Sequence, residues 1–209
     1  MKKNIIICMT IVSTLFTLSA SAQQRLKMEL GYNIASPLGS FKNDFINKTS
    51  FKGATGELSY AFSPKFQLGL HSGFQSYYQK YDRQQYKLEG NQTVSAVVTN
   101  TMEIVPVMLR GTFFPMAANT AAKIQPYVSA GAGVNMVNYG QYLGEFGGVE
   151  ASTPFAAQAG AGIKIPFGNS YNQTAFKIGA TYNYANYKRN ELTNLNTVGF
   201  NAGVVFPLK

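Results

Sequence analysis

The sequence repeats one pattern along most of its length: apolar or aromatic residues alternate with polar or small ones, with a period of two. The clearest case is FQLGLHSGFQSYY at 66–78, in which Phe66, Leu70 and Phe74 alternate with glutamine, glycine and histidine. Successive side chains of a β-strand point to opposite faces, so this period predicts strands. The same pattern occurs at 26–34, 53–62, 103–114, 124–138, 155–165, 175–187 and 197–208. None of these segments has the spacing of an amphipathic helix, so we expect an all-β chain with little helix.

Eight strands of about ten residues, all antiparallel, can close into an up-and-down barrel that leaves no free edge. The connections favour this topology because tight and long links alternate along most of the chain. Three of the tighter links are SPK, PMAANTAAK and PFGNSYNQT, at 63–65, 115–123 and 166–174. The long links lie at 35–52, 79–102 and 139–153. In such a barrel the long loops share one rim, and the tight turns share the other with both termini. Short periplasmic turns and longer extracellular loops are typical of outer-membrane barrels.

Alternation alone does not decide which face is inside, because a soluble barrel has apolar residues inward and a membrane barrel has them outward. The polar face favours the membrane barrel. It is rich in glycine, serine, asparagine and glutamine, and charged residues make up only 13% of the chain. A solvated surface normally carries about 25–35% charged residues. We therefore predict that the apolar face meets lipid and the polar face lines a narrow lumen.

Aromatic residues on the apolar face support this orientation. Most of them lie toward strand ends, with leucine, valine and alanine between them, as in the aromatic girdles at membrane interfaces. The predicted lipid-facing aromatics are Tyr32, Tyr60, Phe62, Phe66, Phe74, Tyr78, Phe113, Phe155, Phe176, Tyr182, Tyr184 and Phe206.

The N-terminus has the three-part layout of a secretory signal peptide: Lys2 and Lys3, an apolar run, and Ala20-Ser21-Ala22. We expect residues 1–22 to be the signal peptide and residues 23–209 to be the barrel domain. The one cysteine, Cys8, lies in the signal, so the mature chain has no disulfide or thiolate site. The formal charge of the whole chain is +9, but its cations are scattered singly, which argues against nucleic-acid binding.

Three segments resemble strands of a known family: IVPVMLRGTFF, IQPYVSAGAGVN and the closing VGFNAGVVFPL. The chain resembles the small outer-membrane β-barrel proteins, the porin-like family that includes outer-membrane protein A-type transmembrane barrels. The resemblance covers about residues 25–209. It implies an eight-stranded antiparallel up-and-down transmembrane β-barrel in the bacterial outer membrane. It also implies two partners, the lipid of that membrane and its insertion machinery. The family usually ends in an aromatic residue, whereas here Phe206 precedes Pro207, Leu208 and Lys209.

Strand parity also predicts a polar network inside the lumen. Because buried charges need partners, we expect Glu29 and Glu57 each to contact a base. The predicted members are Lys27, Glu29, Glu57, Arg110, Lys164, Lys177 and His71. His71 is the sole histidine, which excludes a site with several histidine ligands, and its neighbour Ser72 faces the opposite way. We predict no catalytic residue, metal or cofactor.

The sequence favours a structural or surface-interaction role, adhesin-like, over enzyme activity. The loops at 35–52, 79–102 and 139–153 would present tyrosines to an extracellular protein or glycan: Tyr77, Tyr78, Tyr81, Tyr86, Tyr139 and Tyr142. Three alternatives stay open. They are a narrow porin-like channel for small solutes, a lipid-modifying enzyme that depends on His71, and a secreted soluble ligand-binding barrel.

Overall fold

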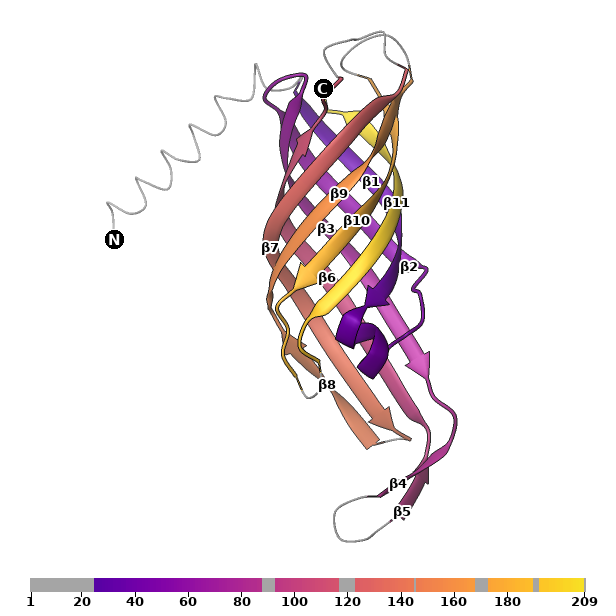
Figure 1. The fold of residues 1–209 in the computed structure, drawn as a ribbon. Coiled ribbons are helices and arrows are strands. Elements are labelled where there is room, and N and C mark those ends of the chain that lie inside the picture. The colour runs from indigo at the N-terminus through magenta and orange to yellow at the C-terminus, as the bar shows by residue number, and fades with distance from the viewer. Residues whose placement is uncertain are drawn as a thin grey trace, which may run out of the picture.

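The structure is a computed structural model that describes residues 25–87, 93–116, 123–144, 146–167, 173–189 and 192–208. Its eight long strands form a closed barrel in which every neighbouring pair is antiparallel (Figure 1). The last strand pairs with the first, from Lys27 opposite Pro207 to Leu38 opposite Asn196, and this closes the wall. The strands are β1 (Leu26–Leu38), β2 (Lys52–Ala61), β3 (Phe66–Lys80), β6 (Val98–Phe113), β7 (Gln125–Leu143), β9 (Phe155–Pro166), β10 (Ala175–Ala185) and β11 (Leu195–Pro207). The predicted all-β, eight-stranded up-and-down barrel is confirmed.

Four shorter elements lie in the connections. They are a single helical turn, η1 (Phe41–Phe45), and the strands β4 (Gln84–Lys87), β5 (Thr93–Ala96) and β8 (Phe146–Ser152). Strand β8 continues β9 along β7 in the same register, after a break at 153–154. In the part of the chain that the structure describes, no helix is both long enough and apolar enough to span a bilayer.

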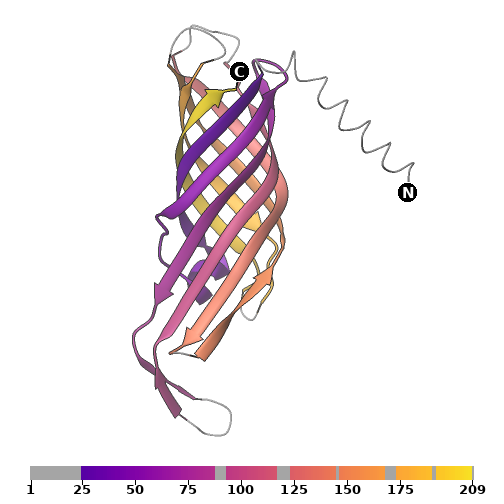
Figure 2. The ribbon, with the colours of Figure 1, turned by 180° about the vertical axis from the view of Figure 1, so that it is seen from behind.

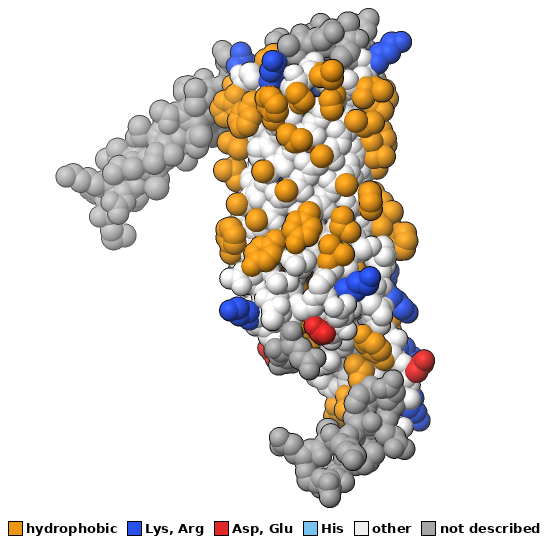
Figure 3. Space-filling model, in the orientation of Figure 1, with side chains coloured by type: hydrophobic (Ala, Val, Ile, Leu, Met, Phe, Trp, Pro, Cys, Tyr) orange, Lys and Arg blue, Asp and Glu red, His pale blue; other side chains and the backbone are white. Residues whose placement is uncertain are grey.

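The apolar face of the wall points outward, as predicted. In β3, Leu70 is 57% exposed and Phe74 is 42% exposed, whereas Gln67 and Gln75 are buried inside. Figure 3 shows hydrophobic side chains around the outer surface of the barrel, with charged side chains gathered near its two ends. Since lipid tails can cover such a surface and water cannot do so favourably, the outer face matches a bilayer.

All twelve predicted aromatics lie on the outer face of the barrel. Two of them, Tyr60 and Phe176, are half-buried by their neighbours, and the other ten are exposed. On the face that Figure 3 shows, the larger hydrophobic side chains form two bands, one near the end of the barrel where the C-terminus lies and one about midway along the molecule. This is the arrangement of the girdles at the two membrane interfaces.

The two ends of the barrel differ in how far their strands and connections extend. Short connections lie at the end where the described chain starts and finishes, which we call the short-turn end. At the opposite, long-loop end part of the wall extends beyond the rest of the barrel (Figures 1 and 2), past the hydrophobic bands that Figure 3 shows. The predicted loop boundaries are therefore wrong: β1 runs to Leu38, β3 to Lys80 and β7 to Leu143, and β6 begins at Val98. Backbone pairing persists in water, but the lipid-facing alternation that marks a strand in the sequence ends with the membrane.

Pro106 interrupts the wall in the middle of β6. The pairing of β3 with β6 runs from Phe66 opposite Phe113 to Ser72 opposite Val107, and resumes at Gln75 opposite Ile104. Proline has no N–H to donate to the ladder, so the pairing lapses beside it.

Candidate functional site

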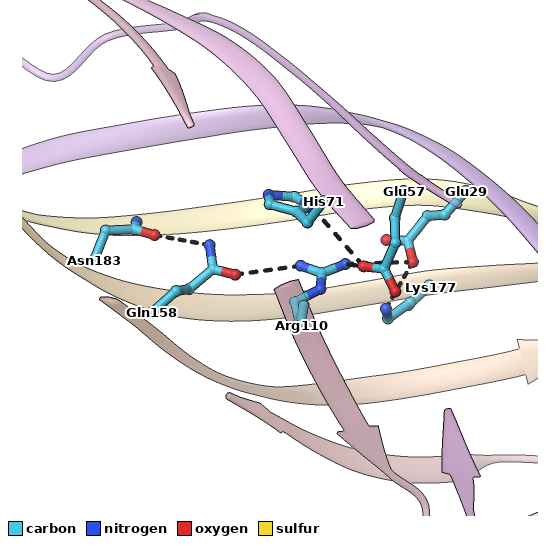
Figure 4. Close-up of polar contacts among 7 residues, drawn as sticks. All are labelled: Glu29, Glu57, His71, Arg110, Gln158, Lys177 and Asn183. Atoms are coloured by element: carbon cyan, nitrogen blue, oxygen red, sulfur yellow. Dashed lines mark hydrogen bonds and ion pairs between the residues drawn. The ribbon is translucent and has the colours of Figure 1, made fainter. Parts of the chain in front are cut away.

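The lumen has a charged half toward the short-turn end, with Arg110 at its centre. One terminal nitrogen of Arg110 (β6) pairs with the carboxylate of Glu57 (β2), and it lies 3.6 Å from that of Glu29 (β1). Lys177 (β10) donates to Glu29 at 2.7 Å, and His71 (β3) lies 3.9 Å from Glu57 (Figure 4). Four of these five residues are at most 6% exposed, and the side chain of Glu29 is 13% exposed. Strands from both sides of the barrel are thus joined across its axis.

Two further lysines lie in the same half. Lys27 and Lys164 are buried, and Lys164 is the cross-strand partner of Lys177. Aromatic rings accompany these lysines: Lys164 lies 5.3 Å above the ring of Phe114, and Lys177 lies 4.6 Å above that of Tyr127. A cation over a ring face is stabilised by the ring quadrupole.

The structure therefore places all seven predicted lumen residues inside the barrel. It also brings in two that the sequence reasoning missed, Phe114 and Tyr127. Tyr127 could have been found, because it is an aromatic residue on the polar face of its strand. Its hydroxyl lies over Gly162 and Gly179, where an added Cβ would come within 2.7 and 2.3 Å of it. Glycine at these two positions leaves room for the ring.

The other half of the lumen is apolar, which parity did not predict. The helical turn η1 folds inward and places Phe41 and Phe45 at the mouth of the barrel, followed by Ile46, all nearly inaccessible to solvent. The ring of Phe41 meets that of Tyr77 edge-on at 5.1 Å, and Phe45 stacks on Tyr139 at 4.5 Å. We call residues 41–46 the plug.

The plug is also fixed by polar contacts. The carbonyl of Phe45 accepts hydrogen bonds from Asn100 at 2.8 Å and from the Tyr81 hydroxyl at 2.9 Å. The side chain of Gln79 accepts one from the N–H of Asn47 at 2.6 Å. These donors and acceptors lie on or beside β3 and β6, so one side of the barrel holds the plug.

The ring of Tyr139, on which Phe45 stacks, also meets an ion pair at the long-loop end. Arg189 lies 4.1 Å above the ring of Tyr139, on the connection between β10 and β11. It also pairs with Glu150 of β8 at 2.5 Å. Burial raises the pKa of the nearby Tyr187 phenol above its ordinary value.

The predicted tyrosine surface needs correction. Tyr77 and Tyr139 do not face outward, because both are at most 5% exposed and pack against the plug. Tyr78 faces the lipid side, and Tyr81 and Tyr142 are half-buried. The side chain of Tyr86 lies outside the described residues. Tyr77 and Tyr139 are buried because residues 41–46 turn into the barrel and pack against them. Strand parity could not predict this contact, because it assigns residues 41–46 to a loop.

A chain of side-chain hydrogen bonds connects the two halves. Arg110 donates to Gln158 at 3.4 Å and Gln158 donates to Asn183 at 2.7 Å (Figure 4). Asn183 in turn donates to Thr197 at 3.2 Å. Beside this chain lies a cavity of about 60 Å³, lined by Arg110 and His71 on one side and by Tyr77 on the other. We call this cavity the chamber.

Among the residues that the structure describes, no group of three or more histidine, cysteine, aspartate or glutamate side chains could hold a metal ion. His71 is 3% exposed and faces the lumen, whereas Ser72 is on the opposite face of the same strand.

Comparison with known proteins identifies the family. The family model of the outer membrane protein beta-barrel domain matches residues 6–206. The chain belongs to this family. It is therefore a bacterial outer-membrane barrel, and the alternative of a secreted soluble carrier is wrong, since its outer face is the apolar one. No curated protein matches the chain at a significant level.

Solved structures of other barrels resemble this outer-membrane barrel at low sequence identity. Neisserial surface protein A (NspA) is 14% identical with a TM-score of 0.54, over 87% of this chain and 95% of that one. OprG from Pseudomonas aeruginosa is 13% identical with a TM-score of 0.47, over 87% and 96%. Ail of Yersinia pestis, in complex with the heparin analogue sucrose octasulfate, is 16% identical with a TM-score of 0.45, over 87% and 98%. The likeness to NspA concerns the fold alone.

Proposed function

We propose that this barrel is a closed, non-enzymatic outer-membrane protein that acts at the cell surface through its long-loop end. One observation carries the proposal: ion pairs and the plug occupy two parts of the lumen, while the wall continues past its apolar surface into the exposed strand β8. A barrel of eight strands has room inside for little more than its own side chains. We propose that the ion pairs of Arg110 and the plug use that room to fasten the strands.

The long-loop end offers a surface for a partner. All seven residues of β8 are exposed, including Phe146 at 83% and Val149 at 57%. The backbone N–H of Asn135 donates to the carbonyl of Pro154. Hydrogen-bonded pairs recur at every second residue of an antiparallel ladder, so Glu150 and Ser152 also direct their backbone N–H and C=O groups toward β7. The backbone groups of Gly147, Val149 and Ala151 then point away from the sheet. A free edge with apolar side chains suits an extended segment of a partner protein.

The two other candidate functions have less support. A narrow channel would need both the plug and the charged network to move. A lipid-modifying enzyme would need His71 to reach lipid, and its ring lies on the inner side of the wall.

Two measurements test the proposal. In planar bilayers, the refolded protein should give no steady conductance, and regular channel openings would contradict the closed lumen. For the surface role, a photo-crosslinking amino acid at Val149 should give a discrete protein adduct on whole cells. The same group at Lys65, at the short-turn end, is the control. Equal adducts from both positions, or none from Val149, would reject β8 as the contact surface.

A further inference from the structure

Neutral hydrogen-bonding groups and apolar side chains share the lining of the chamber, which lies between the charged network and the plug. Six carboxamide side chains and three threonines border it: Asn33, Gln75, Asn135, Gln158, Asn183, Asn201, Thr55, Thr181 and Thr197. The apolar side chains of Ile104, Met108 and Leu195 also line it. This mixture of amides and aliphatic groups differs from the charged network on one side of the chamber and from the aromatic plug on the other.

Several lining groups have hydrogen-bonding capacity that the described residues do not use. The Oδ1 atom of Asn135, the Nδ1 atom of His71 and the Nε atom of Arg110 have no hydrogen-bond partner among them. All three residues are at most 5% exposed. A buried polar atom without a partner is costly, so a molecule that fills the chamber with complementary groups would be stabilising.

Other lining groups are already held in place. Asn33 donates to Gln75 at 2.8 Å, and Gln75 in turn donates to Ser50 at 2.7 Å. On the opposite side, Gln158 and Asn183 are fixed by their hydrogen bonds between Arg110 and Thr197. Amides that are fixed before a ligand arrives lose little side-chain entropy on binding, which favours recognition.

The charged network beside the chamber argues for a neutral ligand. Arg110 is paired with Glu57, and Glu29 is paired with Lys177 at 2.7 Å. A charged ligand would have to leave water and would meet carboxylates and bases that are already engaged with one another. Hydroxyl groups both donate and accept, as carboxamides do, and a short carbon chain fits the aliphatic part of the lining.

We propose that the chamber is a binding site for a small neutral polyol. The volume sets its size: a space of about 60 Å³ is several times the roughly 10–15 Å³ that one water needs, which corresponds to a molecule near the size of glycerol. The ligand enters from the long-loop end, because the plug is part of a connection, whereas the charged network joins five strands of the wall.

The test uses glycerol as the probe and the refolded full-length barrel in detergent micelles. Saturation-transfer NMR should show saturable transfer from the protein to the glycerol protons. The variant Asn135→Leu fills the chamber and removes an acceptor, so the apparent affinity should fall about tenfold or more. Asn138→Leu, on the exposed face of the same strand, is the matched control and should bind as wild type does. Thr181→Val, which removes one lining hydroxyl, serves if Asn135→Leu does not fold.

Each other result overturns the proposal. No transfer to wild type, or equal transfer to Asn135→Leu and wild type, would show that the chamber takes only water. Stronger transfer to glycerate than to glycerol would show that the site selects an anion instead.

The route of entry has its own test. The Ser40 and Thr193 hydroxyl oxygens lie 3.3 Å apart, between the start of the plug and the connection before β11. The double variant Ser40→Cys, Thr193→Cys, in a chain without other cysteines after Cys8, should lock the plug when oxidised. We expect glycerol exchange to slow at least tenfold on oxidation and to recover on reduction. Exchange that is unchanged by oxidation would exclude this route.

Discussion

At the scale of single residues, the molecule contains one ion pair buried in its lumen and another exposed at its long-loop end. Arg110 and Glu57 are buried together, so each depends on the other to offset the cost of leaving water. Arg189 and Glu150 form the same kind of ion pair at the surface, where the side chain of Glu150 is 69% exposed. The two pairs allow a direct comparison of buried and exposed charge within one molecule.

We expect Glu57→Ala to lower the free energy of unfolding by about 3 to 5 kcal/mol, because it leaves Arg110 buried without the carboxylate nearest to it. Glu150→Ala should change it by less than about 1 kcal/mol, since water screens an exposed pair. The measurement is the temperature at which the folded, fast-migrating band is lost on a gel. Equal midpoints for Glu57→Ala and wild type would mean that the network does not fasten the strands.

Strand parity could predict which residues enter the lumen, but not which of them meet. The period of two assigns each side chain to a face, so Glu29, Glu57 and Arg110 could be placed inside from the sequence alone. Their pairing depends on register and on the stagger between strands β1, β2 and β6, and a single sequence does not state either. The role of Tyr127 was missed for a related reason: its space exists because Gly162 and Gly179 lie on two other strands.

At the scale of elements, the plug shows where pattern reasoning stops. The eight wall strands were predictable because the membrane imposes the same alternation on each of them. The turn η1 has no such constraint, and its burial depends on Tyr77 and Tyr139, which are far away in the sequence. The spacing of Phe41 and Phe45, four residues apart in the loop predicted at 35–52, was the signal available. It fits one apolar face of a helical turn.

Phe41→Ala should destabilise the barrel by about 3 to 5 kcal/mol, because a fully buried ring is lost from a packed cluster. Lys42→Ala, at the exposed neighbouring position, is the control and should have little effect. Urea titration of tyrosine fluorescence in micelles would measure both. If the two variants unfold at the same urea concentration, the plug is not part of the folded core.

At the scale of the whole molecule, the position of the membrane can be argued from the outer surface. The exposed aromatics define two bands on the wall, and the sheet formed by β3, β6, β7 and β8 continues beyond one of them (Figures 2 and 3). Proteins of this class place short turns in the periplasm and long connections outside the cell. We therefore expect the extension to stand in the extracellular space and the turn at 62–65 to lie in the periplasm.

Cysteine labelling of intact cells tests this orientation. Val149→Cys lies on the extension, and Lys65→Cys lies in a short turn; both positions are exposed, and the chain has no other cysteine after Cys8. A membrane-impermeant maleimide should label Val149→Cys on whole cells, because no lipid separates it from the medium. Lys65→Cys should react only after the outer membrane is permeabilised. If the pattern were reversed, β8 would face the periplasm, and the plug would close the barrel from within the envelope. The surface role would then have no exposed sheet to act through, whereas the lipid-facing wall and the chamber would stand unchanged.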